Sequence, residues 1–259
     1  MTVNYSQYLQ LDKILKAQDL KSDNEHDEML FIIIHQVYEL WFKQMLHEGA
    51  ALQASLSAGV FERSVATLSR MLTILKTMVG QTDILETMTP ISFSAFRTRL
   101  ESASGFQSAQ FRMFEFFLGN KNAKMIALHG EQSQVGQTLV KMFNGPTLYD
   151  SFLSFLAKRG YDIPTSILNR EFNSPYKASQ DVQNILLKIY KTDSTTMQLC
   201  EKMVDLDEGI QEWRYRHVKM VERTIGTKIG TGGSSGVEFL KATLFKPAFV
   251  DLWEVRSSF

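Results

Sequence analysis

Residues 30–46 read LFIIIHQVYELWFKQML, and this stretch decides the fold class of the 259-residue chain. Its apolar side chains recur three and four residues apart, which is the spacing of an α-helix. One predicted face carries Leu30, Ile34, Val37, Trp41 and Met45, and the other carries Phe31, His35, Tyr38 and Phe42. A helix that is apolar nearly all round is normally buried, so we expect this segment inside a core.

The residues before this stretch predict where its helix begins. Ser22-x-x-Glu25 resembles a capping box, in which each side chain bonds the other residue's backbone N–H. Asp27 and Glu28 follow in the first turn, where negative charge complements the helix dipole.

Helical periodicity continues along the chain, whereas the alternating pattern typical of strands is scarce. Thr89-Pro90 predicts a helix start, and Gly119 and Gly160 predict helix ends. The expected helices cover about 65–78, 90–100, 108–118, 148–158 and 180–224, with breaks near 104–105 and 192–194 and a loop at 162–176. We therefore predict a single all-α domain over residues 1–259, a helical bundle with few or no strands.

Composition excludes several classes of protein. Lys and Arg total 28, as do Asp and Glu, so the basic footprint of a nucleic-acid binder is missing and self-association is favoured. The only cysteine, Cys200, allows no intramolecular disulfide, which is typical of a reducing compartment. The longest clean apolar run, Met29–Ile34, is far too short for a membrane span. These observations predict a cytoplasmic protein with no nucleic-acid or membrane partner.

His217 is the first candidate for chemistry. It belongs to a seam of side chains three and four apart, formed by Met203, Leu206, Ile210, Trp213, His217 and Met220. A histidine there is most often a core residue with one hydrogen bond, but a neutral imidazole on a buried helix also suits an axial metal or haem ligand. His35 raises the same question on a separate helix. No His-x-x-x-His or cysteine pair indicates zinc.

The glycine-rich loop from Gly230 to Gly236 is the second candidate. Its spacing fits neither a phosphate-binding P-loop nor a dinucleotide fingerprint, so nucleotide binding is not indicated. It is either a flexible linker or a lid whose backbone and Thr231 hydroxyl approach a ligand. Arg97 is either a surface ion-pair residue or, if it faces a pocket, a clamp for a carboxylate.

Four blocks of sequence give the chain a resemblance to the tryptophan 2,3-dioxygenase family. The first is Tyr5-Ser-Gln-Tyr8-Leu9 with Leu15 and Gln18, and the second is HDEMLFIIIHQVYELWF at 26–42. The third is Phe96-Arg97 followed by ASGFQSxxFR at 103–112, and the fourth is His217 through Gly236. The blocks are long, unusual and in the order of the family, and together they cover nearly the whole chain.

The resemblance implies an all-helical homotetramer that encloses haem b, ferrous when active, and inserts both atoms of O2 across the indole C2–C3 bond of L-tryptophan, giving N-formyl-L-kynurenine. It implies that His217 is the axial haem ligand and that His35 is the distal histidine that hydrogen-bonds the indole N–H. Substrate binding is implied for Phe31, Arg97, Thr231 and Phe93, and, from a neighbouring subunit, for Tyr5, Tyr8 and Leu9 within an N-terminal segment of about residues 1–20. Cofactor binding is implied for Arg112, Ser104 and Gly105.

Two alternatives remain open from the residues. One is a related haem oxygenase or monooxygenase acting on a substituted indole, and the other is a non-catalytic sensor of haem or tryptophan. Phe93 occupies a position where some members of the family carry tyrosine, so a polar contact to substrate is not expected from it. Val237-Glu-Phe239 likewise replaces a tyrosine-rich stretch.

Overall fold

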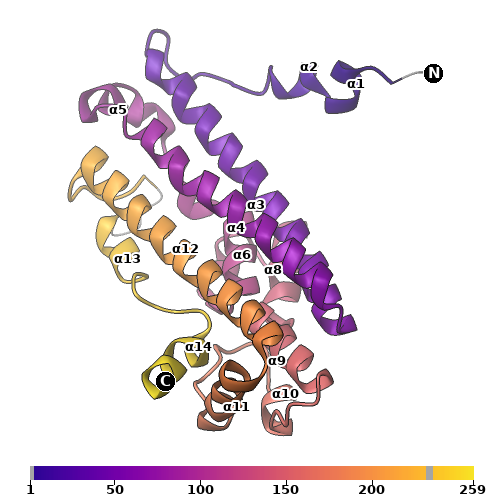
Figure 1. The fold of residues 1–259 in the computed structure, drawn as a ribbon. Helices are drawn as coiled ribbons and strands as arrows, with labels where there is room; N and C mark the ends of the chain where they lie inside the picture. The colour runs from indigo at the N-terminus through magenta and orange to yellow at the C-terminus, as the bar shows by residue number, and fades with distance from the viewer. Residues whose placement is uncertain (1–2, 232–235) are drawn as a thin grey trace.

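Three long helices form the body of the protein. The computed structural model describes residues 3–231 and 236–259, and within these residues it contains helices and no strand, which confirms the all-α prediction. Helix α4 (Phe61–Leu85) packs against both α3 (His26–Ala58) and α12 (Ser194–Ile225), and the three run side by side along the molecule (Figure 1). The central core lies between them and α9 (Leu148–Lys158).

Shorter helices close the two ends of this body. At one end lie α5 and α13, and at the other lie α10, α11 and α14, while α6 packs against α3 and α8 packs against α6 (Figure 1). Their bounds, with those of the remaining elements, are α1 Tyr5–Leu9, α2 Leu11–Ile14, α5 Pro90–Arg97, α6 Ala109–Leu118, α7 Lys124–Ala127, α8 Gln134–Asn144, α10 Thr165–Leu168, α11 Gln180–Thr192, α13 Val237–Lys241 and α14 Val250–Glu254, and the 3₁₀ turns η1 Thr98–Leu100, η2 Gly105–Gln107 and η3 Val255–Ser258.

Several predicted helix boundaries are confirmed with their capping contacts. The Thr89 hydroxyl accepts a hydrogen bond from the backbone N–H of Ser92 (3.1 Å), directly before Pro90 opens α5. Gly119 ends α6 with a positive φ of 109°, a conformation that glycine adopts without strain. The break near residue 193 is also present, because the Asp193 carboxylate caps α12.

The predicted capping box at Ser22 and Glu25 is wrong. Glu25 itself is the N-cap of α3, and its side chain makes no capping hydrogen bond. The side chain of Ser22 bonds the carboxylate of Glu28 instead, and the backbone N–H groups of Lys21 and Ser22 donate to the same carboxylate at 2.7 and 2.8 Å. Glu28 is 1% exposed, so its buried carboxylate requires hydrogen-bond donors. The Ser22 hydroxyl, which the sequence predicted to cap the helix, is one of these donors.

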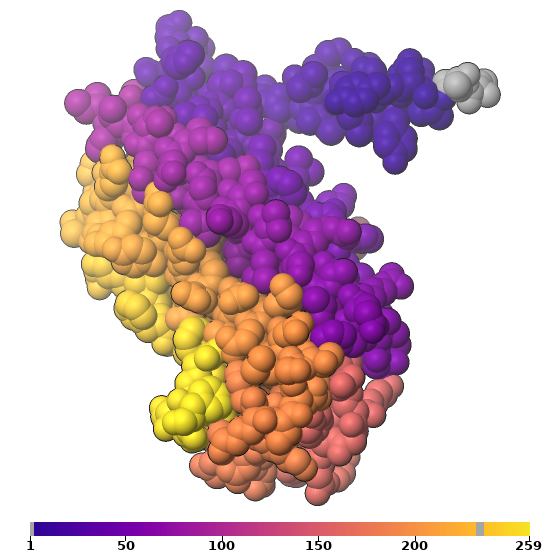
Figure 2. Space-filling view, in the orientation of Figure 1, coloured from indigo at the N-terminus to yellow at the C-terminus, as the bar shows by residue number. Residues whose placement is uncertain are grey.

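Helix α3 is also less buried than its sequence predicts. Ile34 and Met45 are almost fully buried, but Met29, Ile33 and Leu40 on another side are 38%, 43% and 55% exposed. The N-terminal helices α1 and α2 also expose large side chains, among them Tyr5, Tyr8 and Ile14, and they stand away from the body of the molecule (Figure 2). Within one chain, therefore, this part of the surface stays uncovered.

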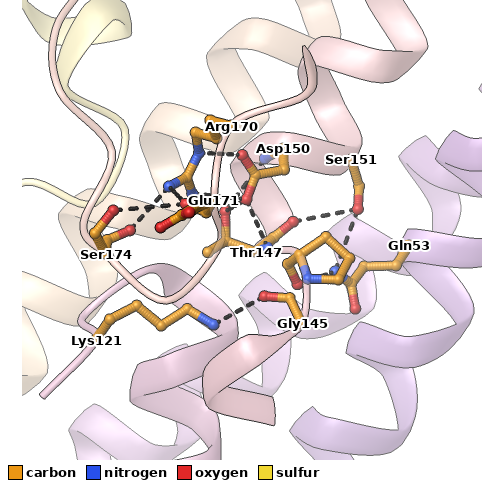
Figure 3. Close-up of polar contacts among 10 residues, drawn as sticks. Gln53, Lys121, Gly145, Thr147, Asp150, Ser151, Arg170, Glu171 and Ser174 are labelled. Atoms are coloured by element: carbon orange, nitrogen blue, oxygen red, sulfur yellow. Dashed lines mark hydrogen bonds and ion pairs between the residues drawn. The ribbon is translucent and has the colours of Figure 1, made fainter. Parts of the chain in front are cut away.

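A buried polar network, here called the Asp150 network, fixes the start of α9 (Figure 3). The Asp150 carboxylate accepts hydrogen bonds from the backbone N–H and the hydroxyl of Thr147 at 2.8 and 2.7 Å. Arg170 donates to both carboxylate oxygens at 2.7 and 2.8 Å, so the two opposite charges are paired. Lys121 lies nearby and donates to the carbonyls of Met142 and Gly145 at the end of α8.

Short elements account for most of the remaining differences. Helix α8 and the single turns α7, α13 and α14 were not expected, and α10 interrupts the loop predicted for residues 162–176. Such short helices are marginal alone and form because they pack on the body. None of the helices in residues 3–231 and 236–259 has the length and hydrophobicity needed to cross a bilayer.

Candidate functional site

One cavity collects side chains from four separate parts of the chain. It is lined from α3, from the end of α4 through most of α6, from α12, and from the segment after α12. Most of the residues singled out in the sequence line it, namely Phe31, His35, Phe93, Arg97, Ser104, Gly105, Arg112, His217 and Thr231. Tyr5, Tyr8 and Leu9 do not line this cavity in their own chain, because they lie on the projecting α1.

His217 reaches the cavity from the last third of α12. The indole of Trp213, one turn earlier, stacks against its imidazole with ring centroids 5.3 Å apart and an interplanar angle of 5°. The rings of Phe42 and Phe111 hold Trp213 from the core side, at 6.0 and 5.2 Å. The orientation of the imidazole is thus set by packing, and no hydrogen bond of this ring occurs among the described residues.

The charge state of His217 suits a metal ligand. Burial, with a smaller contribution from the nearby His35, lowers the pKa of His217 to about 4. The imidazole is therefore neutral near pH 7 and has a lone pair to donate. Because the ring borders the cavity, that lone pair is available to a ligand bound there.

His35 enters the cavity from α3 and has a defined tautomer. Its Nδ1 lies 2.6 Å from the carbonyl oxygen of Phe31, one turn earlier, and a carbonyl can only accept. Nδ1 therefore carries the proton, which leaves Nε2 as a hydrogen-bond acceptor. Burial lowers the pKa of His35, against the opposing effect of the Phe31 carbonyl, so the ring stays neutral.

An aromatic wall adjoins His35. The Phe31 ring lies 4.2 Å from the His35 ring and 5.6 Å from the rings of both Phe93 and Phe96. Phe93 and Phe96 are 8% and 0% exposed. This wall is apolar and rigid, and it offers flat faces to a planar ligand.

Two polar residues at the edge of the cavity are engaged with backbone carbonyls. Arg97 donates from Nη2 to the carbonyl of Ile229 at 2.6 Å, and Thr231 donates from Oγ1 to the carbonyl of Ala103 at 2.7 Å. These bonds join the α5 region to the segment after α12. Residues 232–235 of the predicted lid lie outside the described residues, so the lid remains a prediction.

Arg112 lies in a buried ion cluster that the sequence did not reveal. Its guanidinium pairs with Glu115, and Glu115 also pairs with Arg214 at 3.1 Å. All three side chains line the cavity. A usable signal for Arg214 existed, because it precedes His217 by three residues and so shares its helix face. Tyr38 and Glu39 are further lining residues that sequence reasoning did not assign to the site.

The site and fold thus define an all-helical protein with two neutral histidines facing one largely apolar cavity. The family model described as tryptophan 2,3-dioxygenase matches residues 1–146 and 150–259. The chain therefore belongs to the tryptophan 2,3-dioxygenase family.

Individual members of the family are similar over almost their whole length. The tryptophan 2,3-dioxygenase of Anaeromyxobacter sp. (strain K) is 52% identical over 99% of this chain and 96% of that protein. The protein of the same name from Herpetosiphon aurantiacus is 50% identical over 98% of both chains. The one from Arthrobacter sp. (strain FB24) is 41% identical over 98% of this chain and 91% of that protein.

Proposed function

We propose that this protein is a haem-dependent dioxygenase that cleaves the indole C2–C3 bond of L-tryptophan with O2 and releases N-formyl-L-kynurenine. One observation carries the proposal: His217 and His35, on different helices, are both neutral and both face one cavity, whose edge carries Arg97 and Thr231. Membership of the family supports the reaction and the substrate.

The cavity fits a haem by its own donor set. His217 offers an imidazole lone pair and is held from behind by Trp213, as a single axial protein ligand should be. The Nε of Arg112 is buried without a hydrogen-bond partner, which suits an acidic group on a bound molecule. We assign His217 as the axial ligand of haem b and Arg112, with Ser104 and Gly105, to the cofactor.

When bound in the ferrous state, haem supplies the activation of O2 that the protein's own side chains cannot provide. The protein's part is to bind and orient tryptophan. Phe31 and Phe93 would hold the indole plane, while Arg97 and Thr231 would bind the carboxylate and the ammonium group. The carbonyl contacts that these side chains make now are compatible with both roles, because the Thr231 oxygen can accept from the ammonium group while its hydroxyl donates to Ala103, and Arg97 has N–H donors besides the one on Ile229.

His35 would position the indole by accepting a hydrogen bond from its N–H at Nε2. The tautomer set by the Phe31 carbonyl leaves this nitrogen free of a proton, as that role requires. A neutral imidazole is a poor match for full removal of so weakly acidic a proton. We therefore expect His35→Ala to slow turnover without abolishing it. Complete loss of turnover, with haem content and tryptophan affinity intact, would contradict this assignment.

The assembly belongs to the same proposal. We propose a cytoplasmic homotetramer of single-domain chains, in which Tyr5, Tyr8 and Leu9 complete a neighbouring subunit's pocket. The projecting α1, with its exposed tyrosines, and the exposed apolar side chains of α3 support it, since a partner subunit could cover both (Figures 1 and 2). Light scattering of the chain with and without residues 1–20 tests this arrangement.

The decisive experiment is an absorbance titration of the reduced, haem-loaded protein with L-tryptophan under O2, with the product analysed by mass. We expect a haem spectrum that responds to tryptophan and a product heavier by two oxygen atoms. A product heavier by one oxygen atom would instead indicate a monooxygenase. Tryptophan binding without any product would indicate a sensor.

A further inference from the structure

The buried ion cluster beside His217 does not balance its own charge. Arg112 and Arg214 share the carboxylate of Glu115, and the three side chains are 6%, 10% and 6% exposed. Two guanidinium groups and one carboxylate leave a net charge of +1 out of contact with bulk water. Because an uncompensated buried charge is costly, an anion is expected next to this cluster.

The cavity as a whole shows the same excess. Its charged lining residues, in the part of the chain that the structure describes, are Arg97, Arg112 and Arg214 against Glu39 and Glu115. The carboxylate of Glu39 already accepts a hydrogen bond from Gln110 at 2.9 Å. No ion pair joins Glu39 to these arginines among the described residues, and three arginines against two carboxylates leave an excess of one positive charge that an acidic ligand would balance.

Arg112 also has a donor to spare. One terminal nitrogen donates to the carbonyl of Phe106 at 3.2 Å, and the other bonds Glu115, but the buried Nε has no partner. The rings of Phe106 and Phe111 lie 5.0 and 5.3 Å from the guanidinium carbon and restrict its movement. A fixed guanidinium with a free N–H is a ready site for a carboxylate.

Arg214 places this surplus charge next to the proposed axial ligand. It lies three residues before His217 on α12, so both side chains leave the same face of the helix. Its Nη1 donates to the carbonyl of Thr243 at 3.2 Å and its Nη2 to Glu115, which gives the side chain one orientation. A ligand held by His217 would thus meet the cluster as well.

We infer that Arg214, oriented by Glu115, acts with Arg112 to anchor a propionate carboxylate of the haem. The inference rests on the proposed function, because it takes the occupant of the cavity to be haem. It adds Arg214 as a binding residue and Glu115 as a positioning residue. Binding energy is thus drawn from the acidic edge of the cofactor as well as from its iron.

The test compares haem with its dimethyl ester, in which both propionates are uncharged. Wild-type apoprotein and the R214M variant are titrated with each, following the haem absorbance band. A charge-assisted hydrogen bond corresponds to about a tenfold to a hundredfold preference for the free acid in the wild type, and R214M should lose most of it. Binding of the ester should be nearly unchanged, and R214K should keep part of the preference.

The matched control is R216M, two residues further along the same helix. Arg216 pairs with Asp83 at the end of α4 and with Glu86, the C-cap of that helix, outside the cavity lining. The variant removes one positive charge from α12 and should leave the preference intact. The role of Glu115 is tested with E115Q. If Glu115 orients the two arginines, the preference for haem over its dimethyl ester should fall in this variant. A rise in that preference would show that Glu115 only neutralises the arginines, and would overturn its positioning role.

Different outcomes separate the inference from the proposed function. If wild-type protein binds neither form of haem, the proposed function fails. If it binds haem and R214M keeps the full preference, or loses affinity for acid and ester equally, the inference is overturned. A selective loss of tryptophan affinity in haem-loaded R214M would also overturn it, because the anion would then be the substrate. Should R214M not fold by circular dichroism, R214Q takes its place under the same criteria.

Discussion

The Asp150 network and the Arg112–Glu115–Arg214 cluster are both buried ion systems, but they differ in balance. In the first, Asp150 is matched by Arg170 and by both donors of Thr147 (Figure 3). In the second, one carboxylate serves two arginines, and the Nε of Arg112 has no partner. Lys121 beside the first system is also buried, but its ammonium group donates to two carbonyls, so the contrast lies in the hydrogen bonds: in the second system a buried N–H of Arg112 has no acceptor.

This difference shows how a buried charge can be assigned to folding or to binding. In a balanced network, removing one member destabilises the folded state, because the other member is left buried and unpaired. An unbalanced one that borders a cavity costs stability until its ligand arrives.

The largest effect is expected from His217→Ala. The variant should purify without stoichiometric haem, because the axial lone pair is gone, and added imidazole should restore part of the binding. Haem content per chain is the measurement, with circular dichroism as the control for folding. A five-coordinate histidine-haem spectrum in the variant would rule out His217 as the ligand.

Next in size is Asp150→Asn. Breaking a buried ion pair by removing one partner costs about 3–5 kcal/mol, so the free energy of unfolding in urea should fall by that amount. Asp83→Asn is the matched control, since Asp83 is mostly exposed and its pair with Arg216 is worth about 0–1 kcal/mol. Haem affinity of the folded protein should not change in either variant. A fall in haem affinity for Asp150→Asn would show that the Asp150 network also affects ligand binding, and would contradict its assignment to folding alone.

Arg97→Met should have a smaller and selective effect. Loss of one charge-assisted hydrogen bond weakens tryptophan binding by at least about tenfold to a hundredfold. Tryptamine, which has no carboxylate, should lose little affinity. Equal losses for the two ligands would mean that Arg97 acts only through its contact with Ile229.

The smallest effect concerns pH and His35. Burial lowers the pKa of His35 in the folded protein, while in the unfolded chain it is about 6.5. As pH falls below about 6.5 the unfolded chain binds the proton first, so this histidine makes the apoprotein less stable, by up to about 1.4 kcal/mol per pH unit. Urea unfolding at several pH values should show a shallower decline for His35→Gln than for the wild type. An identical pH dependence would show that the pKa of His35 is the same folded and unfolded.

The sequence by itself determined the fold class and most of the long helices. Spacing of three and four around Trp41 and Trp213 reports a helix face directly, and caps such as Thr89, Gly119 and Asp193 act within a few residues. The roles of His35 and His217 came from resemblance, because spacing alone favoured two ordinary core histidines. Most of the residues that the sequence named in this way line the cavity, although their roles stay predictions.

Only the tertiary structure decided where those residues meet and how charges are shared. Glu115 joins Arg112 to Arg214, 99 positions away from it in the chain, and such a pairing has no local signature. The hydrogen bond of Ser22 could not be predicted from local sequence either. Its hydroxyl bonds Glu28 because that carboxylate is buried, and it does not cap the helix. Periodicity and capping are local and can be read from sequence, whereas the balance of buried charge depends on which distant helices pack together.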